Sequence, residues 1–259
     1  MQIASDNDLF VVEDCAQAHG AKYKGKSVGS IGHIGCWSFC QDKIMTTGGE
    51  GGMVTTNDEG LWKKMWSYKD HGKSYDAIYH KEHPPGFRWL HESFGTNWRM
   101  TEIQAAIGRY QITQMSLWTQ KRNEHQNAIW DCAKKINGLR VPSFKCSACE
   151  CSAIVPKCVH AAYKCYVFIK PEYLKDSWDR DRLIEEISNM GVPCFSGSCS
   201  EVYLEKAFDD TTYRPKSRLK NAKILGETSL MFLVHPTLKK EEIDLTCDVL
   251  VQVMEKASK

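Results

Sequence analysis

Short apolar runs alternate with polar and glycine-rich stretches over the first seventy residues. Residues 9–12 form a continuous apolar run, which is typical of a strand buried on both faces of a parallel sheet. Further strands are predicted at residues 36–39 and 53–56, with a glycine-rich turn at 48–52 and a helix at 58–68. This alternation predicts an α/β unit whose sheet is mainly parallel.

A longer helical pattern begins after a stretch, residues 73–95, whose Tyr, His, Pro and Gly content predicts an irregular loop. Thr101 and Gln104 have the spacing of a capping box, in which each side chain caps the other's backbone N–H. The apolar face of this helix carries Ile103, Ile107 and Tyr110. The pattern continues to Gly138, which is long for one globular helix, so a kink or break is predicted near Trp118.

The remaining residues predict a second, smaller α/β unit. Strands are expected at residues 166–169 and 230–234, and helices at 179–190 and 241–254. The first of these helices places Leu183, Ile187 and Met190 inward and ends at Gly191. The chain therefore divides into two predicted domains, residues 1–120 and residues 121–259, with the boundary inside the long helix.

Composition narrows the class of protein. Of the 259 residues, 42% are hydrophobic and 25% are charged, and the net charge of +2 gives no strong field that would attract nucleic acid or an acidic membrane. No apolar run approaches the ~18 residues that span a bilayer. The first eight residues are polar, unlike a signal peptide. We therefore expect a cytoplasmic protein with no membrane or nucleic-acid partner.

The chain has twelve cysteines, which we interpret mainly as buried thiols, because a chain of this length does not need disulfide staples. One cluster contains Cys146, Cys149, Cys151 and Cys158, followed by His160 and Cys165. A C-x-x-C pair can begin a zinc site, but the second tight pair of such a site is missing. The expectation is a reduced loop without metal, and structural zinc is the alternative.

Three segments together carry a resemblance to a known family. They read VEDCAQAHG at 12–20, SFCQDK at 38–43 followed by GEGGMV at 49–54, and NWRMTEIQAA at 97–106. In order and spacing they resemble the DegT/DnrJ/EryC1/StrS sugar aminotransferases, and the resemblance covers essentially the whole chain. It implies the fold of type I pyridoxal-phosphate enzymes, an α/β fold like that of aspartate aminotransferase. Residues 1–120 would then be the C-terminal portion of the cofactor-binding large domain, and 121–259 the small domain.

The resemblance assigns Lys43 as the Schiff-base lysine of pyridoxal 5'-phosphate, whereas the alternative is an ordinary surface lysine. An amine on a flexible stem can condense with an aldehyde when its surroundings favour the neutral form. Ser38 matches the hydroxyl that binds the cofactor phosphate, or is a strand-end serine bonded to the backbone. Asp14 matches the carboxylate that faces the ring nitrogen and keeps it protonated, or is an aspartate that caps the next turn.

Further site residues follow from the same resemblance. Gln17 matches the residue that packs near the ring, and His19 is either a site residue or a structural histidine. Asn97 and Arg99 match an N-x-R element whose asparagine reaches the cofactor phosphate of the neighbouring subunit, which implies a homodimer with shared active sites. The aromatic residues of the expected loop either line a sugar-nucleotide pocket or pack on the core: Tyr75, Tyr79, Phe87, Trp89 and Phe94.

The implied reaction is transamination of a nucleotide-linked keto-deoxyhexose with glutamate as amino donor, in cell-surface polysaccharide or amino-sugar biosynthesis. Family members have a longer segment before the strand at residue 9, which supplies a helix-terminus phosphate turn. A chain without it is expected to bind the cofactor weakly, so a non-catalytic remnant or partner subunit is the main alternative. A related sugar dehydratase is a weaker one, because that subgroup has histidine where this chain has Lys43.

Overall fold

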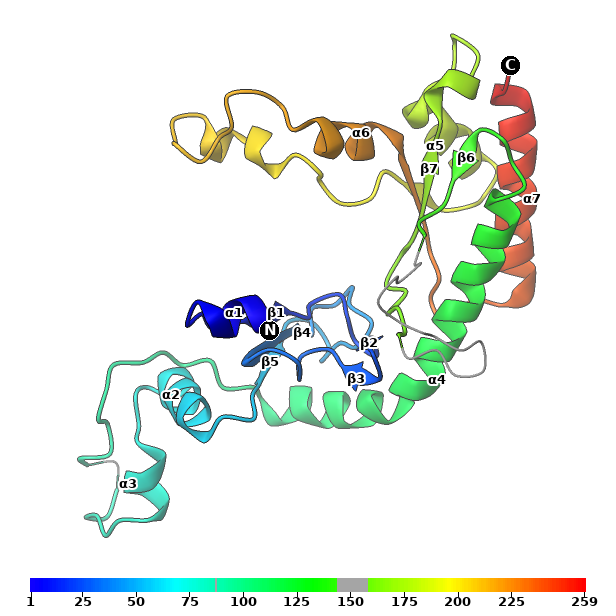
Figure 1. The fold of residues 1–259 in the computed structure, drawn as a ribbon. Coiled ribbons are helices and arrows are strands. Elements are labelled where there is room, and N and C mark those ends of the chain that lie inside the picture. The colour runs from blue at the N-terminus through cyan, green and yellow to red at the C-terminus, as the bar shows by residue number, and fades with distance from the viewer. Residues whose placement is uncertain (87, 144–157) are drawn as a thin grey trace. The chain divides into compact units, whose positions relative to one another are not determined.

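The computed structural model describes every residue except 87 and 144–157 (Figure 1). The described chain forms two compact units. Residues 1–119 and 158–161 belong to the first unit, and residues 120–143 and 162–259 belong to the second. Helix α4 (Glu102–Ala133) runs from the first unit into the second, and the division falls on it between Thr119 and Gln120.

A three-stranded sheet organises the first unit, in the order β1-β4-β5. Strand β1 (Val12–Asp14) pairs parallel with β4 (Ile34–Ser38), and β4 pairs antiparallel with β5 (Gly52–Thr55). The short helix α1 (Gln2–Asp6) precedes β1, and the hairpin of β2 (Lys22–Tyr23) and β3 (Lys26–Ser27) lies between β1 and β4 in the chain. The predicted α/β class is confirmed.

The first strand differs from its prediction. It begins at Val12, and Leu9, Phe10 and Val12 are all exposed, although the apolar run predicted a strand buried on both faces. The faces of a strand are buried only where other segments pack over them, and β1 also lies at one edge of the described sheet, where it pairs only with β4. Continuous apolar sequence predicts a strand, but tertiary pairing decides which of its faces is covered.

Helix α2 (Glu59–Lys69) forms as predicted and begins at Asp58, whose side chain accepts a hydrogen bond from the Leu61 N–H at 2.7 Å. The stretch predicted to be an irregular loop contains a helix, α3 (Tyr75–Tyr79). The Ser74 hydroxyl caps it by accepting from the Ala77 N–H at 3.2 Å. Its Tyr75 ring packs on α2, which stabilises a helix too short to form alone.

The capping box at the start of α4 is confirmed. Thr101 N–H donates to Gln104 Oε1 at 3.0 Å, and Gln104 N–H donates to Thr101 Oγ1 at 3.4 Å. No break occurs near Trp118, since α4 continues without interruption for 32 residues, and the alternative of a kink stays a prediction. Its sequence contains no proline, and its one glycine, Gly108, lies in the buried face.

The second unit contains an antiparallel sheet in the order β6-β7-β9-β8 (Figure 1). Its strands are β6 (Leu139–Arg140), β7 (Cys165–Ile169), β8 (Cys194–Phe195) and β9 (Ser229–Phe232). Its helices are η1 (Pro171–Tyr173), α5 (Arg180–Asn189), η2 (Val202–Leu204), η3 (Lys206–Phe208), α6 (Lys220–Thr228) and α7 (Lys240–Ala257). The inward positions predicted for α5 are confirmed: Leu183 and Ile187 are fully buried, and Met190 packs against the core.

The two ends of the cysteine cluster have different surroundings. Cys158 accepts a hydrogen bond from the Lys24 N–H in the first unit, whereas Cys165 is buried in the apolar core of the second. Cys146, Cys149 and Cys151 lie outside the described residues. Among the residues that the structure describes, no group of three or more potential ligands is placed to hold a metal ion. Within the same part of the chain, no helix combines the length and apolar character needed to cross a bilayer.

Candidate active site

The parallel pairing of β1 and β4 brings two predicted site residues to one edge of the sheet. Asp14 is the last residue of β1 and lies opposite Cys36, and the Cys15 N–H donates to the Cys36 carbonyl at 2.8 Å. Ser38 ends β4 two residues further on. The carboxyl ends of parallel strands form the edge at which α/β proteins bind ligands. A carboxylate and a hydroxyl are therefore available together there.

Local contacts fix both side chains. Asp14 is exposed, and its Oδ1 accepts a hydrogen bond from the Ala16 N–H at 3.0 Å. Ser38 is half-buried, and its hydroxyl oxygen accepts from the Cys40 N–H at 3.4 Å. These are the backbone contacts that the local-turn interpretations predicted. They orient the side chains, and a carboxylate or hydroxyl retains further hydrogen-bonding capacity.

Lys43 follows Ser38 in the loop that leaves β4. Its side chain is 16% exposed, and its Nζ lies 3.6 Å from Asp42 Oδ1, on a carboxylate that is 54% exposed. Its backbone N–H donates to the Cys40 carbonyl at 3.0 Å, which closes a tight turn. Most of the Lys43 side chain is therefore shielded from solvent, which is less common for a surface lysine.

The loop that carries Lys43 is closed on itself by backbone hydrogen bonds. The Phe39 N–H donates to the Gly51 carbonyl at 2.8 Å, and the Thr47 N–H donates to the Phe39 carbonyl at 3.2 Å. Gly52 then pairs with Ser38 as β5 begins. A Cβ atom at Gly52 would lie 2.8 Å from the Trp37 carbonyl oxygen, so glycine allows this close approach.

Glu13 is a structural residue of the site that sequence reasoning gave no role. Its carboxylate accepts hydrogen bonds from the backbone N–H groups of Gly29, Ile31 and Gly32 at 2.8, 2.8 and 2.6 Å. Burial alone would raise the pKa of this carboxyl, but the three N–H donors outweigh it and hold the pKa below its ordinary value. The glycine-rich stretch after a strand-end glutamate was the signal available in the sequence.

The two other residues of the first motif lie in different environments. Gln17 is exposed, as a residue that contacts a ligand needs to be. His19 is 4% exposed, and its ring lies 5.3 Å from the Trp37 ring and 5.9 Å from the Phe39 ring, measured between centroids. This packing supports the structural role for His19.

Asn97 and Arg99 are held by contacts with the end of α2. Asn97 forms a β-bridge with Asp70, and the Arg99 Nε donates to Asn97 Oδ1 at 3.1 Å and lies 3.8 Å from Asp70 Oδ1. Asp70 is buried, which alone would raise the pKa of its carboxyl, but Lys73, Arg99 and Lys69 lower it below its ordinary value. Asn97 and Arg99 are exposed, so this segment presents both to solvent.

The aromatic residues divide between packing and exposure. Tyr75 packs on α2 through Trp62 and Trp66, whereas Tyr79, Trp89 and Phe94 are exposed, and Phe87 lies outside the described residues. A groove of about 900 Å³ lies in the first unit, and none of the described aromatic residues predicted to line a pocket lines it. It is lined from β4, β5, α2 and the segment before α4, mainly by Trp37, Met53, Trp62, Trp66, Tyr68 and Trp98.

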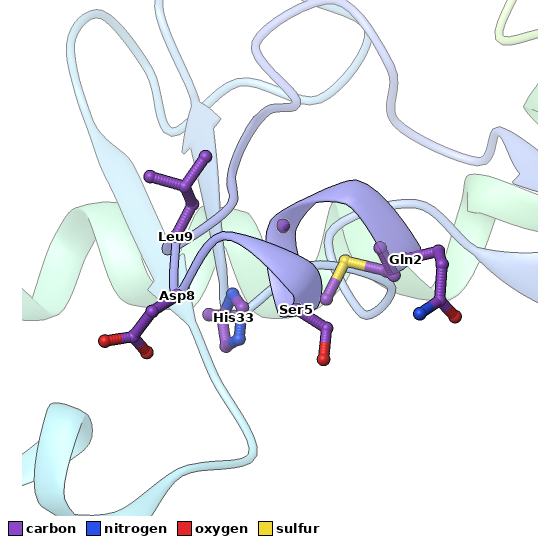
Figure 2. A pocket seen from close by; sticks show the side chains of 7 residues that line it. Gln2, Ser5, Asp8, Leu9 and His33 are labelled. Carbon is purple, nitrogen blue, oxygen red and sulfur yellow. The ribbon is translucent and has the colours of Figure 1, made fainter.

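Another hollow, of about 390 Å³, is lined by residues of α1, by residues that flank it and by His33 (Figure 2). His33 forms one wall, where its Nδ1 accepts a hydrogen bond from the Val11 N–H at 2.8 Å. Gln2, Ser5, Asp8 and Leu9 line the remainder (Figure 2). None of the site residues predicted from the sequence lines this hollow, so we assign it no part in the site.

The fold is that of the type I pyridoxal-phosphate-dependent sugar aminotransferases. The chain belongs to the DegT/DnrJ/EryC1/StrS aminotransferase family, which matches residues 1–251 and whose enzymes depend on pyridoxal phosphate. In the X-ray structure of an aminotransferase from Psychrobacter cryohalolentis, the matching chain is 60% identical with a TM-score of 0.92. That match covers 99% of this chain and 64% of that one.

Two proteins that are similar to this chain in sequence are longer than it. A GDP-perosamine synthase of Escherichia coli O157:H7 is 42% identical over 140 residues, which are 54% of this chain and 34% of that protein. An uncharacterized protein of Methanocaldococcus jannaschii is 31% identical over 246 residues, which are 94% of this chain and 59% of that protein. Two of these matches cover nearly all of this chain but only about three fifths of the other protein. The chain thus spans about three fifths of the length of these relatives.

Proposed function

We propose that this chain carries the catalytic lysine and part of the cofactor site of an aminotransferase that acts on a nucleotide-linked keto sugar. Membership of the aminotransferase family supports the reaction class. The similarity to GDP-perosamine synthase and to two further nucleotide-sugar aminotransferases supports the substrate class. The carrying observation is the joint placement of Asp14 and Ser38 at one sheet edge, next to the loop of the largely buried Lys43.

These residues fit the chemical groups of pyridoxal 5'-phosphate. The cofactor, when bound, supplies an aldehyde that exchanges amino groups and a ring that withdraws electrons from the reacting carbon. The Lys43 amine would hold the cofactor covalently, and once released it would move the proton between substrate and cofactor carbons. Its partial burial shields this amine from bulk water.

The other site residues would bind and orient. Asp14 would keep a proton on the ring nitrogen, because a carboxylate stabilises the protonated form. The Ser38 hydroxyl would donate to the phosphate, and Gln17 would pack near the ring. Asn97 and Arg99 would reach the cofactor phosphate of a second copy of the chain, for which their exposure leaves them available.

The proposal also includes an amino donor, an oligomeric state and a biosynthetic setting. Glutamate is the proposed amino donor, and a homodimer with shared active sites is the proposed assembly. Cytoplasmic amino-sugar or polysaccharide biosynthesis is the proposed setting, and similarity to a spore coat polysaccharide biosynthesis protein of Bacillus subtilis supports it.

Substitution of Lys43 tests the proposal. The wild type, Lys43→Ala and the control Lys26→Ala, at an exposed hairpin lysine, are prepared in a complete form of the protein, incubated with pyridoxal phosphate and reduced with borohydride. We expect reduction to label Lys43 in the wild type and control, and Lys43→Ala to lose both the label and the visible absorbance. The rate of amino transfer from glutamate to keto-sugar nucleotides should also fall in Lys43→Ala. A label on another lysine would show that the assignment is wrong.

A further inference from the structure

A stripe of four residues on helix α4 contacts residues 46–50, the part of the loop that follows Lys43. The stripe consists of Gln104, Ile107, Gly108 and Gln111. Their spacing of i, i+3, i+4 and i+7 places all four on one face of a helix. Of the apolar face predicted from the sequence, Ile107 belongs to this stripe, whereas Ile103 and Tyr110 are exposed.

The two glutamines at the ends of the stripe bond the loop backbone. Gln111 Oε1 accepts a hydrogen bond from the Thr46 N–H at 2.8 Å, and the Gln104 Nε2 donates to the Glu50 carbonyl. A backbone N–H in an irregular loop has no neighbouring strand to pair with, and a side-chain acceptor can satisfy it instead. The two glutamine side chains thus form hydrogen bonds with the loop backbone of the kind that strand pairing forms in a regular sheet.

The two central positions bring the helix and the loop into close contact. A Cβ atom added to Gly108 would lie 3.1 Å from the Thr47 Cγ2 and 3.7 Å from the Met45 Cε. A Cβ atom added to Gly48 would lie 2.9 Å from the Ile107 Cδ1, and Gly48 has a φ of +80°. The loop therefore has little space to move toward the helix between its two hydrogen-bonded points.

The order of the contacts shows that the loop follows the helix. Gln111 meets Thr46, Gly108 meets Thr47, Ile107 meets Gly48, and Gln104 meets Glu50, so the loop runs antiparallel to α4. Lys43 lies three residues before the first contact. Because residues 46–50 are held at four points, the adjacent turn that carries Lys43 is restricted in position as well.

We propose that Gln111 is a positioning residue for Lys43, with Gln104 as the second hold on the same loop. The part of this inference that concerns cofactor attachment rests on the proposed function of Lys43. The part that concerns the loop rests only on the contacts described above. Gln111 itself has no role in the reaction, since it acts through the Thr46 backbone.

The test compares Gln111→Met, which removes the acceptor at similar volume, with Gln111→Glu, which retains it. Gln120→Met is the matched control, because the exposed Gln120 side chain on the same helix bonds Glu124 on its own helix. Amide hydrogen exchange over residues 44–51 reports on the loop. We expect exchange about tenfold faster in Gln111→Met, equivalent to the loss of one hydrogen bond, and near-normal exchange in Gln111→Glu and Gln120→Met. Equal exchange in Gln111→Met and wild type would overturn the inference.

Borohydride trapping of pyridoxal phosphate then reports on Lys43 in the same four proteins. We expect slower trapping at Lys43 in Gln111→Met and rescue in Gln111→Glu, with thermal melting confirming that all four are folded. A faster-exchanging loop with unchanged trapping would overturn the positioning role. If the wild type is not labelled at Lys43, the proposed function fails, and the exchange comparison still decides whether Gln111 holds the loop.

Discussion

Two adjacent carboxylates at the end of β1 have different surroundings. Glu13 accepts three backbone hydrogen bonds from residues 29–32, whereas Asp14 accepts one, from Ala16, and is exposed. Successive side chains in a strand point to opposite faces, so neighbours in sequence have separate environments. The Glu13 carboxylate is therefore occupied by hydrogen bonds within the fold, and Asp14 is the carboxylate accessible to a ligand.

Replacement of Asp14 by asparagine separates these roles. We expect the Asp14→Asn protein to fold normally, because an amide oxygen can still accept from the Ala16 N–H. Amino transfer should fall by at least about a hundredfold, since an amide does not favour a protonated ring nitrogen. Circular dichroism and a transamination assay measure the two effects. Near-normal turnover with an unchanged cofactor spectrum would exclude the proposed role.

At the scale of elements, Glu13 connects β1 to the turn that precedes β4. Its three N–H donors belong to a glycine-containing turn that no strand pairs with, so the carboxylate acts as the organiser of that turn. Hydrogen bonds from backbone N–H groups to an ionised carboxylate are stronger than those to a neutral acceptor.

Glu13→Gln should lower the free energy of unfolding by about 1–3 kcal/mol at neutral pH. The folded pKa of Glu13 lies below its ordinary value of 4.5, so its contribution is complete above that value and is lost as the pH falls through the folded pKa. The difference between wild type and variant should therefore shrink on acidification. Urea unfolding at a series of pH values measures it, with the exposed Glu185→Gln as control. A pH-independent difference would contradict this account.

At the scale of the whole molecule, the first unit exposes several large apolar side chains. They are Phe10 before β1, Val12, Met53 and Val54 on the sheet, and Ile103 and Tyr110 on α4. Where exposed apolar side chains gather, they mark surfaces that other protein segments cover. Ile103 lies close in sequence to Asn97 and Arg99, the element proposed to reach a second subunit.

We therefore expect the protein to form dimers through this part of the first unit. Sedimentation velocity should show a dimer that weakens in Ile103→Asp, because a buried unpaired charge opposes association. Leu245→Asp, at an exposed position of α7 in the second unit, should leave it unchanged. A monomer at every concentration, or equal weakening by both substitutions, would show that this surface is not the interface.

The sequence determined the α/β class, the main elements and the family. Strands β4 and β5, helices α2 and α5, and the capping box of α4 follow from local periodicity and spacing, which are properties of neighbouring residues. Motifs can be recognised for the same reason, because Asp14, Ser38 and Lys43 lie in short segments whose order is visible. The domain boundary and the roles of these residues remain predictions.

Only the tertiary structure decided which surfaces are covered and which residues hold the site. The exposure of Val12 and the hydrogen bonds of Glu13 depend on which segments meet, and so do the contacts of Gln104 and Gln111 with the Lys43 loop. Sixty-five residues separate Thr46 from Gln111 in the chain, and no local pattern records such a contact. Local sequence encodes propensity, whereas burial and partners are set by packing between distant segments.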